Sequence, residues 1–191
     1  MNSVWIGITI GVFIAGIGIG YAVFQASSQA VIMTTTNAQD ELEKYKLAEL
    51  LADKHLKTFD DLDFDVFTNQ KWEQLHESHS QDIIVHWPDG RKTQGIEPHI
   101  EDLKTMFVYA PDTRIQEHPI RIASGEWTSV IGIIEGTFTE PMPLPDGNSI
   151  PPTDKPFKLI MCTVGHWKDG VMDEEYLFWD NQEFMKQIGL A

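Results

Sequence analysis

The chain has 191 residues and carries 14 Lys and Arg against 29 Asp and Glu, a formal net charge of −15. This acidic balance argues against nucleic acid or anionic lipid headgroups as partners, because both need clustered basic side chains. The single cysteine, Cys162, excludes an internal disulfide and any multi-cysteine metal centre. The length suits one ordinary domain with an appendage.

The N-terminal segment is uncharged as far as residue 39. Val4 to Phe24 form an apolar run whose helix would rise about 30 Å, the hydrocarbon thickness of a bilayer. We therefore expect a single-pass membrane anchor that spans residues 4–24 within an N-terminal unit of residues 1–30. The alternative is a signal peptide cleaved near Ala30, which would leave a secreted or periplasmic domain.

The folded domain is expected to cover residues 40–191, after a small, polar spacer at residues 31–39. Thr36 and Gln39 have the spacing of a capping box that opens a helix. Apolar side chains at steps of three and four from Leu42 to Phe59 predict that this helix is amphipathic. The pattern then predicts a short helix over 69–78, a strand over 82–87 and a helix over 97–109.

The remainder of the chain has the composition of β-strands, rich in β-branched and aromatic residues. The predicted strands are Arg114–Ala123, Ser129–Phe138, Phe157–Trp167 and Val171–Asp180. Lys168-Asp169-Gly170 is a hairpin turn between the last two strands, and a short helix over 181–188 closes the chain. Helices followed by an antiparallel meander predict an α+β fold, with the helices on one face of a curved sheet.

A series of short sequence words supports a family resemblance from about Asp40 to Ala191. The words are His86-Trp87-Pro88, Gly95, Tyr109-Ala110-Pro111-Asp112, Gly136-Thr137-Phe138, Ile150-Pro151-Pro152-Thr153-Asp154-Lys155, Lys168-Asp169-Gly170, Glu174-Glu175, Trp179-Asp180 and Gln187-Ile188-Gly189. In this order they resemble the SnoaL-like polyketide (ester) cyclases of the nuclear-transport-factor-two-like superfamily. The resemblance implies a cone-like curved antiparallel sheet, wrapped by N-terminal helices around an apolar cavity, and a homodimer formed through the open sheet.

The resemblance also implies an acid/base pair, an Asp on the last strand and a His one strand away. Asp180 and His166 occupy these positions, and we expect them to be the catalytic residues. A carboxyl group in an apolar pocket has a raised pKa, which suits proton transfer. Asp180 followed by Glu183 is also a capping box for the terminal helix, and that structural role remains open beside the catalytic one.

Further side chains are expected to contact the substrate at strand ends and along the faces of the sheet. They are His86, Trp87, His118, Trp127, Phe138, Glu174, Tyr176 and Phe178. His76 and His79 could offer two imidazoles, but with no third ligand identifiable we expect a solvated helix end and no metal site. The acidic positions between 40 and 65 are expected to be a solvated surface, and no cofactor is expected.

Two classes of function fit this sequence. The first is a cofactor-free acid/base enzyme, a cyclase, isomerase or dehydratase that acts on a small apolar carbonyl compound. The second is a non-catalytic module that is tethered to the membrane and binds a lipophilic ligand or dimerises. The orientation of Asp180 and His166 relative to the cavity distinguishes the two.

Overall fold

The computed structural model describes the backbone of residues 4–144 and 146–191. It describes side chains for residues 24–27, 29, 35, 37–144 and 146–191. The chain divides into two compact units, Met1–Leu47 and Ala48–Ala191.

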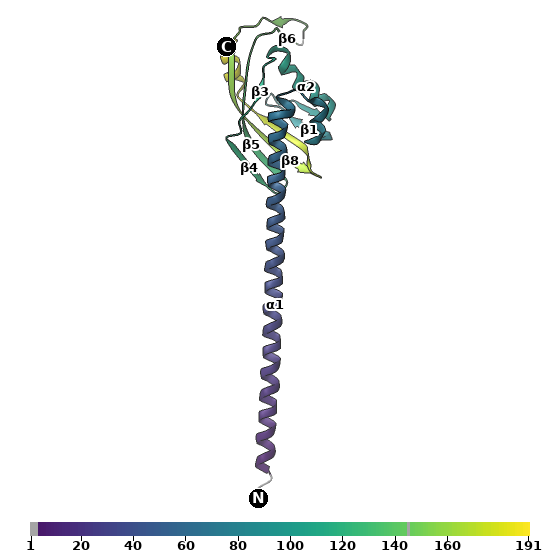
Figure 1. Cartoon of the computed structure of the whole chain (residues 1–191), viewed down its shortest axis with the longest axis vertical. Helices are drawn as coiled ribbons and strands as arrows, with labels where there is room; N and C mark the ends of the chain where they lie inside the picture. The colour runs from purple at the N-terminus through teal and green to yellow at the C-terminus, as the bar shows by residue number, and fades with distance from the viewer. Residues whose placement is uncertain (1–3, 145) are drawn as a thin grey trace. The chain divides into compact units, whose positions relative to one another are not determined.

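The first unit contains most of helix α1, which extends from Val4 to Asp61 (Figure 1). The helix predicted to open at Thr36 is therefore part of a longer helix, and residues 31–39 are helical as well. In the described part of the chain, no helix combines the length and the apolar character needed to cross a membrane, which contradicts the single-pass anchor predicted over residues 4–24. The side chains of residues 4–23 lie outside those described.

The second unit begins with the last turns of α1 and alternates short helical turns with strands. A π-helical turn η1 (Leu62–Phe67) and a 3₁₀ helix η2 (Trp72–Glu77) precede the sheet. The remaining elements are β1 (His79–His86), β2 (Lys92–Gln94), α2 (Ile96–Tyr109), β3 (Arg114–Ile115), β4 (Ile120–Ser124), β5 (Trp127–Thr137), β6 (Met142–Pro143), β7 (Ser149–Ile150), β8 (Pro156–Lys168), β9 (Val171–Phe178) and α3 (Asn181–Gln187).

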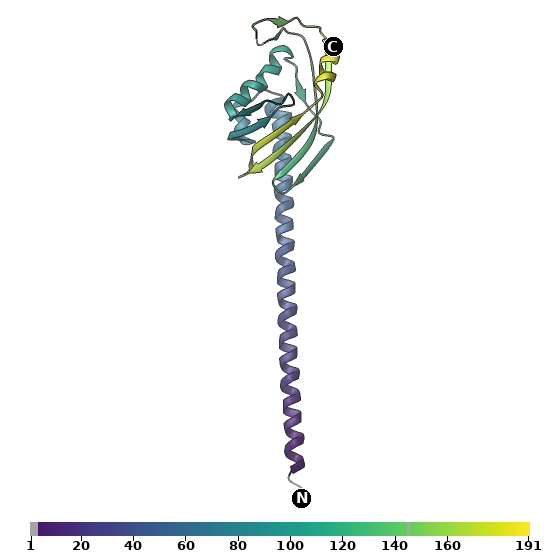
Figure 2. The same ribbon diagram turned by 180° about the vertical axis from the view of Figure 1, so that it is seen from behind.

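The main sheet has the strand order β2-β1-β9-β8-β5-β3, with β4 also paired to β5. Figures 1 and 2 show that it is strongly twisted and that α2 lies against one side. The described pairings are antiparallel except that of β1 with β9, which is parallel. The sheet predicted as antiparallel is therefore mixed at this position.

One face of the sheet forms the core. Buried residues alternate along β8 at Phe157, Leu159, Met161, Thr163 and Trp167, as period-two geometry requires. The helices α2 and the end of α1 pack on this face and bury apolar side chains against it, among them Ile100, Phe107 and Phe59. We refer to this face as the inner face and to the opposite one as the outer face.

The hairpin that joins β8 to β9 confirms the predicted Asp-Gly turn. Asp169 and Gly170 both have positive φ, 53° and 89°, as a tight two-residue hairpin turn requires. The register shifts between His166 and Trp167, so that His166 pairs with Glu174 and Trp167 with Met172. This bulge changes the alternation of β9, and Met172 and Glu175 both lie on the inner face although they are three residues apart.

The strand predicted over Arg114–Ala123 is interrupted. Residues 114–115 and 120–124 pair separately with β5, as β3 and β4. The turn after His86 leads into the short strand β2, which the sequence did not indicate. Both differences involve strands at the edges of the sheet, where pairing with one neighbour leaves a weak sequence signal.

Candidate functional site

An apolar cavity of about 70 Å³ lies between the inner face of the sheet, α2 and η1. Its walls are mostly hydrocarbon, from side chains such as Leu103, Met106, Ile134 and Leu177. Four ionisable side chains in its walls are largely buried: Asp63, His79, His99 and Glu175. Buried ionisable groups that converge on one apolar cavity mark a candidate functional site.

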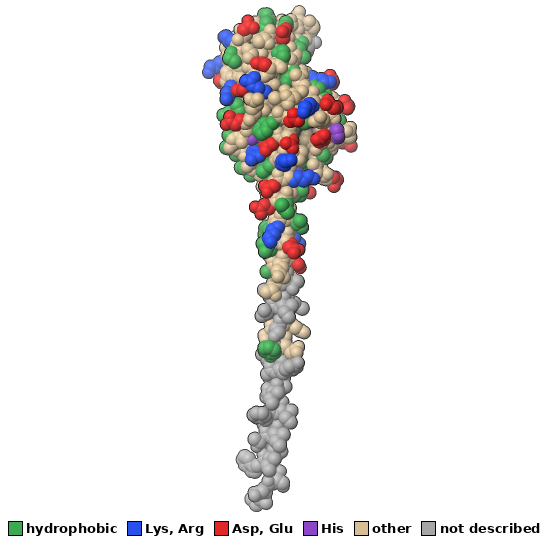
Figure 3. Space-filling model, viewed as in Figure 1, with side chains coloured by type: hydrophobic (Ala, Val, Ile, Leu, Met, Phe, Trp, Pro, Cys, Tyr) green, Lys and Arg blue, Asp and Glu red, His purple; other side chains and the backbone are tan. Residues whose placement is uncertain are grey.

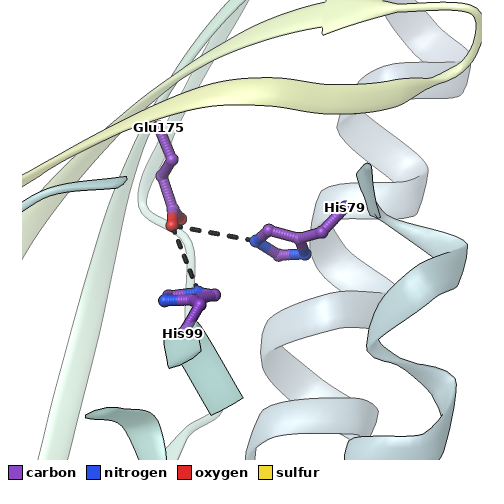
Figure 4. A group of neighbouring side chains, drawn as sticks. All are labelled: His79, His99 and Glu175. Atoms are coloured by element: carbon purple, nitrogen blue, oxygen red, sulfur yellow. Dashed lines mark ion pairs between the residues drawn. The ribbon is translucent and has the colours of Figure 1, made fainter. Parts of the chain in front are cut away.

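His79, His99 and Glu175 point toward one another from three different elements (Figure 4). His79 begins β1, His99 lies in the first turn of α2, and Glu175 lies in β9. Oε2 of Glu175 is 3.7 Å from Nε2 of His79 and 3.5 Å from Nε2 of His99. All three side chains are at least nine-tenths buried.

Burial and mutual attraction determine the charges of this group. Burial opposes ionisation of Glu175, but the neighbouring His79 and His99 outweigh burial and hold its pKa below the usual range. Burial lowers the pKa of His99 to about 4, against the attraction of Glu175. At neutral pH the group therefore contains an ionised carboxylate and an uncharged His99.

Asp63 enters the cavity from η1, the π-helical turn that follows α1. Turns of this kind often occur at functional sites. Oδ2 of Asp63 is 2.8 Å from Nε2 of His118, and Nδ1 of the same imidazole is 2.8 Å from Oδ1 of Asp60. Because each nitrogen faces a carboxylate oxygen, two protons are shared among these three side chains, and an imidazolium accounts for both.

The pKa values of this pair move in the same direction. Burial raises the pKa of Asp63, although the hydrogen bond from His118 opposes the shift, and the nearby Glu175 adds to it. Burial alone would lower the pKa of His118, but its hydrogen bonds to Asp63 and Asp60 outweigh burial and raise it. Asp63 is therefore a buried carboxyl group with a raised pKa at the edge of an apolar cavity.

The mouth of the cavity is formed by two tryptophans. Trp87 and Trp179 meet edge to face, with ring centroids 6.2 Å apart, and both also line an adjoining pocket of about 240 Å³. Trp87 is fixed by a 2.8 Å hydrogen bond from its Nε1 to Thr93 and by Arg91, 5.0 Å above its ring. The cavity and the outer pocket therefore share these two rings as lining.

Asp180, the predicted acid/base residue, is the N-cap of α3 and is exposed. Its Oδ1 accepts hydrogen bonds from the backbone N–H groups of Gln182 and Glu183, at 2.9 and 3.0 Å. Asp180 lies beyond the end of β9, six positions after the residue that pairs with His166. The four strand steps from Glu174 to Phe178 already span about 13 Å, so the structure does not bring the predicted pair together.

His166 lies on the outer face of β8, away from the cavity. Its Nδ1 is 2.6 Å from Asp173, and its ring packs against the half-exposed Trp127 at a centroid distance of 4.6 Å. His166 and Trp127 therefore belong to a surface cluster. Because His166 does not line the cavity, this position does not support its predicted catalytic role.

The other predicted contact residues are divided between the two faces. His86, Glu174 and Tyr176 form an outer cluster, in which Oε1 of Glu174 is 2.8 Å from both Nε2 of His86 and the Tyr176 hydroxyl. Phe178 is exposed on the same face, and Phe138 is fully buried in the core against Tyr109. Trp87 lines the cavity as expected, and His118 lies behind Asp63.

Sequence reasoning missed Asp63, His79, His99 and Glu175. His79, expected at a solvated helix end, is 2% exposed and begins a strand. The signal for His99 was present, because it shares the buried stripe of α2 with Ile96, Ile100 and Phe107 at helical spacing. Asp63 was assigned to a solvated acidic surface, and only the turn of η1 directs it inward.

On the face of the domain seen in Figure 3, charged side chains are not sorted by sign into separate regions. There, Asp and Glu side chains alternate with Lys and Arg and do not form one large patch.

Similar solved structures have the same fold. IdmH from Streptomyces antibioticus, a candidate polyketide cyclase, matches at 20% identity with a TM-score of 0.61, over 71% of this chain and 98% of its own. A candidate SnoaL-like polyketide cyclase from Jannaschia sp. CCS1 matches at 17% identity and a TM-score of 0.64, over 74% and 95%. A candidate polyketide cyclase from Xanthomonas campestris pv. campestris matches at 15% identity and a TM-score of 0.61, over 73% and 99%.

These identities establish the fold alone, and no curated protein has significant sequence similarity to the chain. The family model for the SnoaL-like polyketide cyclase matches residues 57–188, more than half of the chain. The match covers η1, the sheet and α2, and so includes every residue of the cavity described above. The chain therefore belongs to the SnoaL-like polyketide cyclase family.

Proposed function

We propose that the chain catalyses proton transfer on a small, largely apolar carbonyl compound, as a cyclase, isomerase or dehydratase, with Asp63 as the acid/base group. The observation that carries the proposal is the position of Asp63, a buried carboxyl group that lines an apolar cavity and is held by His118. A raised pKa brings a carboxyl group closer to the range in which it both accepts and returns a proton.

The reaction needs no change in oxidation state. Ionised Asp63 takes a proton from the carbon next to the carbonyl, and the electron pair of that C–H bond forms an enolate. In a cyclase, the enolate carbon then forms a bond to a second carbonyl carbon of the same molecule. The new alkoxide takes the proton back from Asp63, which restores the carboxylate.

His118 is a positioning residue in this scheme. Its imidazolium lies between Asp63 and Asp60, packed on Phe64 at a centroid distance of 4.4 Å. The ion pair keeps one oxygen of Asp63 occupied and fixes the orientation of the carboxyl group. Removal of a preorganised neighbour would misplace Asp63 and lower the rate.

The volume of the cavity indicates that only a small part of the substrate, its reacting group, enters it. A cavity of about 70 Å³ holds a few atoms, comparable to two or three waters. The larger outer pocket beyond Trp87 and Trp179 has room for the remainder of a substrate. We therefore expect the carbonyl group to enter the cavity and the rest of the molecule to remain at its mouth.

The test is turnover by Asp63→Asn on a panel of β-keto esters and related carbonyl compounds. Loss of an acid/base group costs about 10²–10⁴-fold in rate, and the variant keeps the shape of the side chain. Asp180→Asn is the control and should keep wild-type turnover. Equal turnover in Asp63→Asn would refute the assignment, and ligand binding without turnover in the wild type would favour the non-catalytic function.

The proposal extends to a homodimer formed through the outer face. Ile120, Ile122, Ile160 and Phe178 are each more than half exposed there. The register places them in one region that extends from β4 across β5 and β8 to β9, since Ile131 pairs with both Ile120 and Cys162, and Cys162 also with Phe178. A contiguous apolar patch of this kind is typical of an interface.

Light scattering on the full chain tests the dimer. We expect twice the chain mass for the wild type and the monomer mass for Ile160→Asp, because the introduced charge would be buried in the interface. Leu144→Asp, at an exposed position between β6 and β7, is the control. A wild-type protein that is monomeric at all concentrations contradicts this part of the proposal.

A further inference from the structure

Three potential metal-ligand atoms meet in the cavity, one from each of His79, His99 and Glu175 (Figure 4). All three atoms lie within 4.8 Å of one another. The side chains come from β1, α2 and β9, so their convergence is produced by the tertiary structure. Two imidazoles and one carboxylate form a ligand set that suits divalent transition metals.

The group has unused hydrogen-bonding capacity. Four buried side-chain nitrogen or oxygen atoms in the described part of the chain have no hydrogen-bond partner, and three of them belong to these residues. They are Nε2 of His79, Nδ1 of His99 and Oε2 of Glu175. Two of these atoms, Nε2 of His79 and Oε2 of Glu175, face each other, whereas His99 contacts Glu175 through its other nitrogen, Nε2. Because buried polar atoms are normally paired, the facing pair indicates a missing ligand.

The hydrogen bonds of Ser78 determine which nitrogen of His79 carries the proton in the neutral imidazole. The Ser78 hydroxyl donates to the carbonyl oxygen of Leu75 at 3.1 Å. It therefore accepts from Nδ1–H of His79, 2.8 Å away. The lone pair of Nε2 is left facing the Glu175 carboxylate, and a cation between these two electron-rich atoms would stabilise both.

We propose that His79, His99 and Glu175 bind one divalent transition-metal ion, with Zn²⁺ as the expected occupant. Zinc binds His nitrogen and carboxylate oxygen at about 2.0–2.2 Å, which places neighbouring tetrahedral ligands about 3.4 Å apart. The separations of Glu175 Oε2 from the two imidazoles, 3.7 and 3.5 Å, are close to that value. All three residues line the apolar cavity, so a water or a carbonyl oxygen in the cavity is the expected fourth ligand.

The metal site goes beyond the proposed function and does not depend on it. Asp63 is not among the three ligands, and its partner in the described structure is His118. A metal ion in this position would polarise a carbonyl group that enters the cavity beside Asp63. The two proposals can therefore be tested separately.

The experiment uses the full chain without a histidine tag, stripped of metal by a chelator. Zn²⁺ is titrated by calorimetry, and Co²⁺ by its visible absorption, which reports coordination geometry. We expect one ion per chain, with His99→Asn and Glu175→Gln each binding more than about 100-fold more weakly. Loss of a ligand exceeds the effect of outer-shell partners, which are themselves worth about 10–100-fold.

Matched controls come from the outer face of the same strands. His86→Leu and Glu174→Gln remove a His–Glu pair one face away and should leave metal binding unchanged. Asp63→Asn should also bind the ion normally while losing turnover. Circular dichroism verifies that each variant is folded, and proton spectra of Co²⁺-loaded wild-type protein test imidazole coordination without any substitution.

Three results would overturn the proposal. One is a wild-type protein that binds neither ion, and a second is binding that survives in both His99→Asn and Glu175→Gln. The third is a loss of binding in the outer-face controls, which would indicate a surface site. A proton on His79 Nε2 would then account for the contact with Glu175, and Asp63 would remain testable as the acid/base group.

Discussion

The strands β1 and β9 carry two His–Glu groups made of the same residue types, one on each face of the sheet. On the outer face, Glu174 accepts hydrogen bonds from Tyr176 and His86, and these side chains are partly exposed. On the inner face, Glu175 lies 3.5–3.7 Å from two buried imidazoles, and its Oε2 has no hydrogen bond. The two glutamates are neighbours in sequence.

The difference between these groups lies in hydrogen bonding and solvent access. In the outer group, Oε1 of Glu174 accepts hydrogen bonds from both partners and water screens the partly exposed side chains, which is typical of a structural surface cluster. The inner group is shielded from water and incompletely paired, which leaves it able to bind a ligand. The same chemistry is therefore structural on one face and a candidate site on the other.

The largest loss of folding stability is expected when the inner group of His79, His99 and Glu175 loses one imidazole. His79→Leu keeps much of the side-chain volume but leaves the buried Glu175 carboxylate without its neighbour on β1, and a buried polar group that loses its partner costs about 1–3 kcal/mol, more when it is charged. His86→Leu on the outer face should cost only about 0.2–1 kcal/mol. Urea unfolding of metal-free protein at neutral pH measures both, and equal costs would contradict the distinction between the faces.

The pair of His118 and Asp63 should contribute to the free energy of unfolding by an intermediate amount that depends on pH. The pKa of His118 is raised in the folded protein, so its stabilisation is complete below the unfolded pKa of about 6.5 and is lost as pH rises through the folded value. His118→Asn should therefore lower stability by about 1–3 kcal/mol at pH 6. Unfolding measured from pH 6 to pH 9 should show this cost shrinking; a constant or growing cost is the contrary result.

A smaller loss of stability is expected on substitution of Asp180, which caps the N-terminus of α3. Asp180→Ala removes the acceptor for two backbone N–H groups of α3 and should cost about 1 kcal/mol, while Asp180→Asn should cost little. Thermal melting measures both, with turnover as the second measurement. A large loss of turnover in Asp180→Asn would restore the catalytic interpretation.

The smallest effect is expected at His166. His166→Phe removes a part-exposed pair with Asp173 but retains an aromatic ring against Trp127, so its cost should stay below about 1 kcal/mol. Turnover should be unchanged because the side chain lies on the outer face. Steady-state kinetics beside a melting curve tests this, and a selective loss of rate would show that the outer face takes part in the reaction.

The alternation of side chains along β8 and β9 shows which features of the site the sequence can predict and which it cannot. Period-two spacing correctly groups His166 with Val164 and Cys162, and Glu174 with Tyr176 and Phe178. It does not identify which group faces the cavity, because both sets on β9 contain a glutamate, Glu174 in one and Glu175 in the other. The resemblance to a family directed attention to Asp180 and His166, which lie at the N-cap of α3 and on the outer face and do not line the cavity.

The sequence by itself determined α2 and the long strands β5, β8 and β9, the hairpin at Asp169-Gly170, the cap at Asp180 and membership in the cyclase family, because these depend on local spacing and backbone preference. The tertiary structure decided the site. Helices cover only one face of the sheet, the bulge after Met172 sets the alternation of β9, and the π-helical turn directs Asp63 inward. Burial of Glu175 with two distant histidines follows from these long-range contacts, which no local pattern encodes.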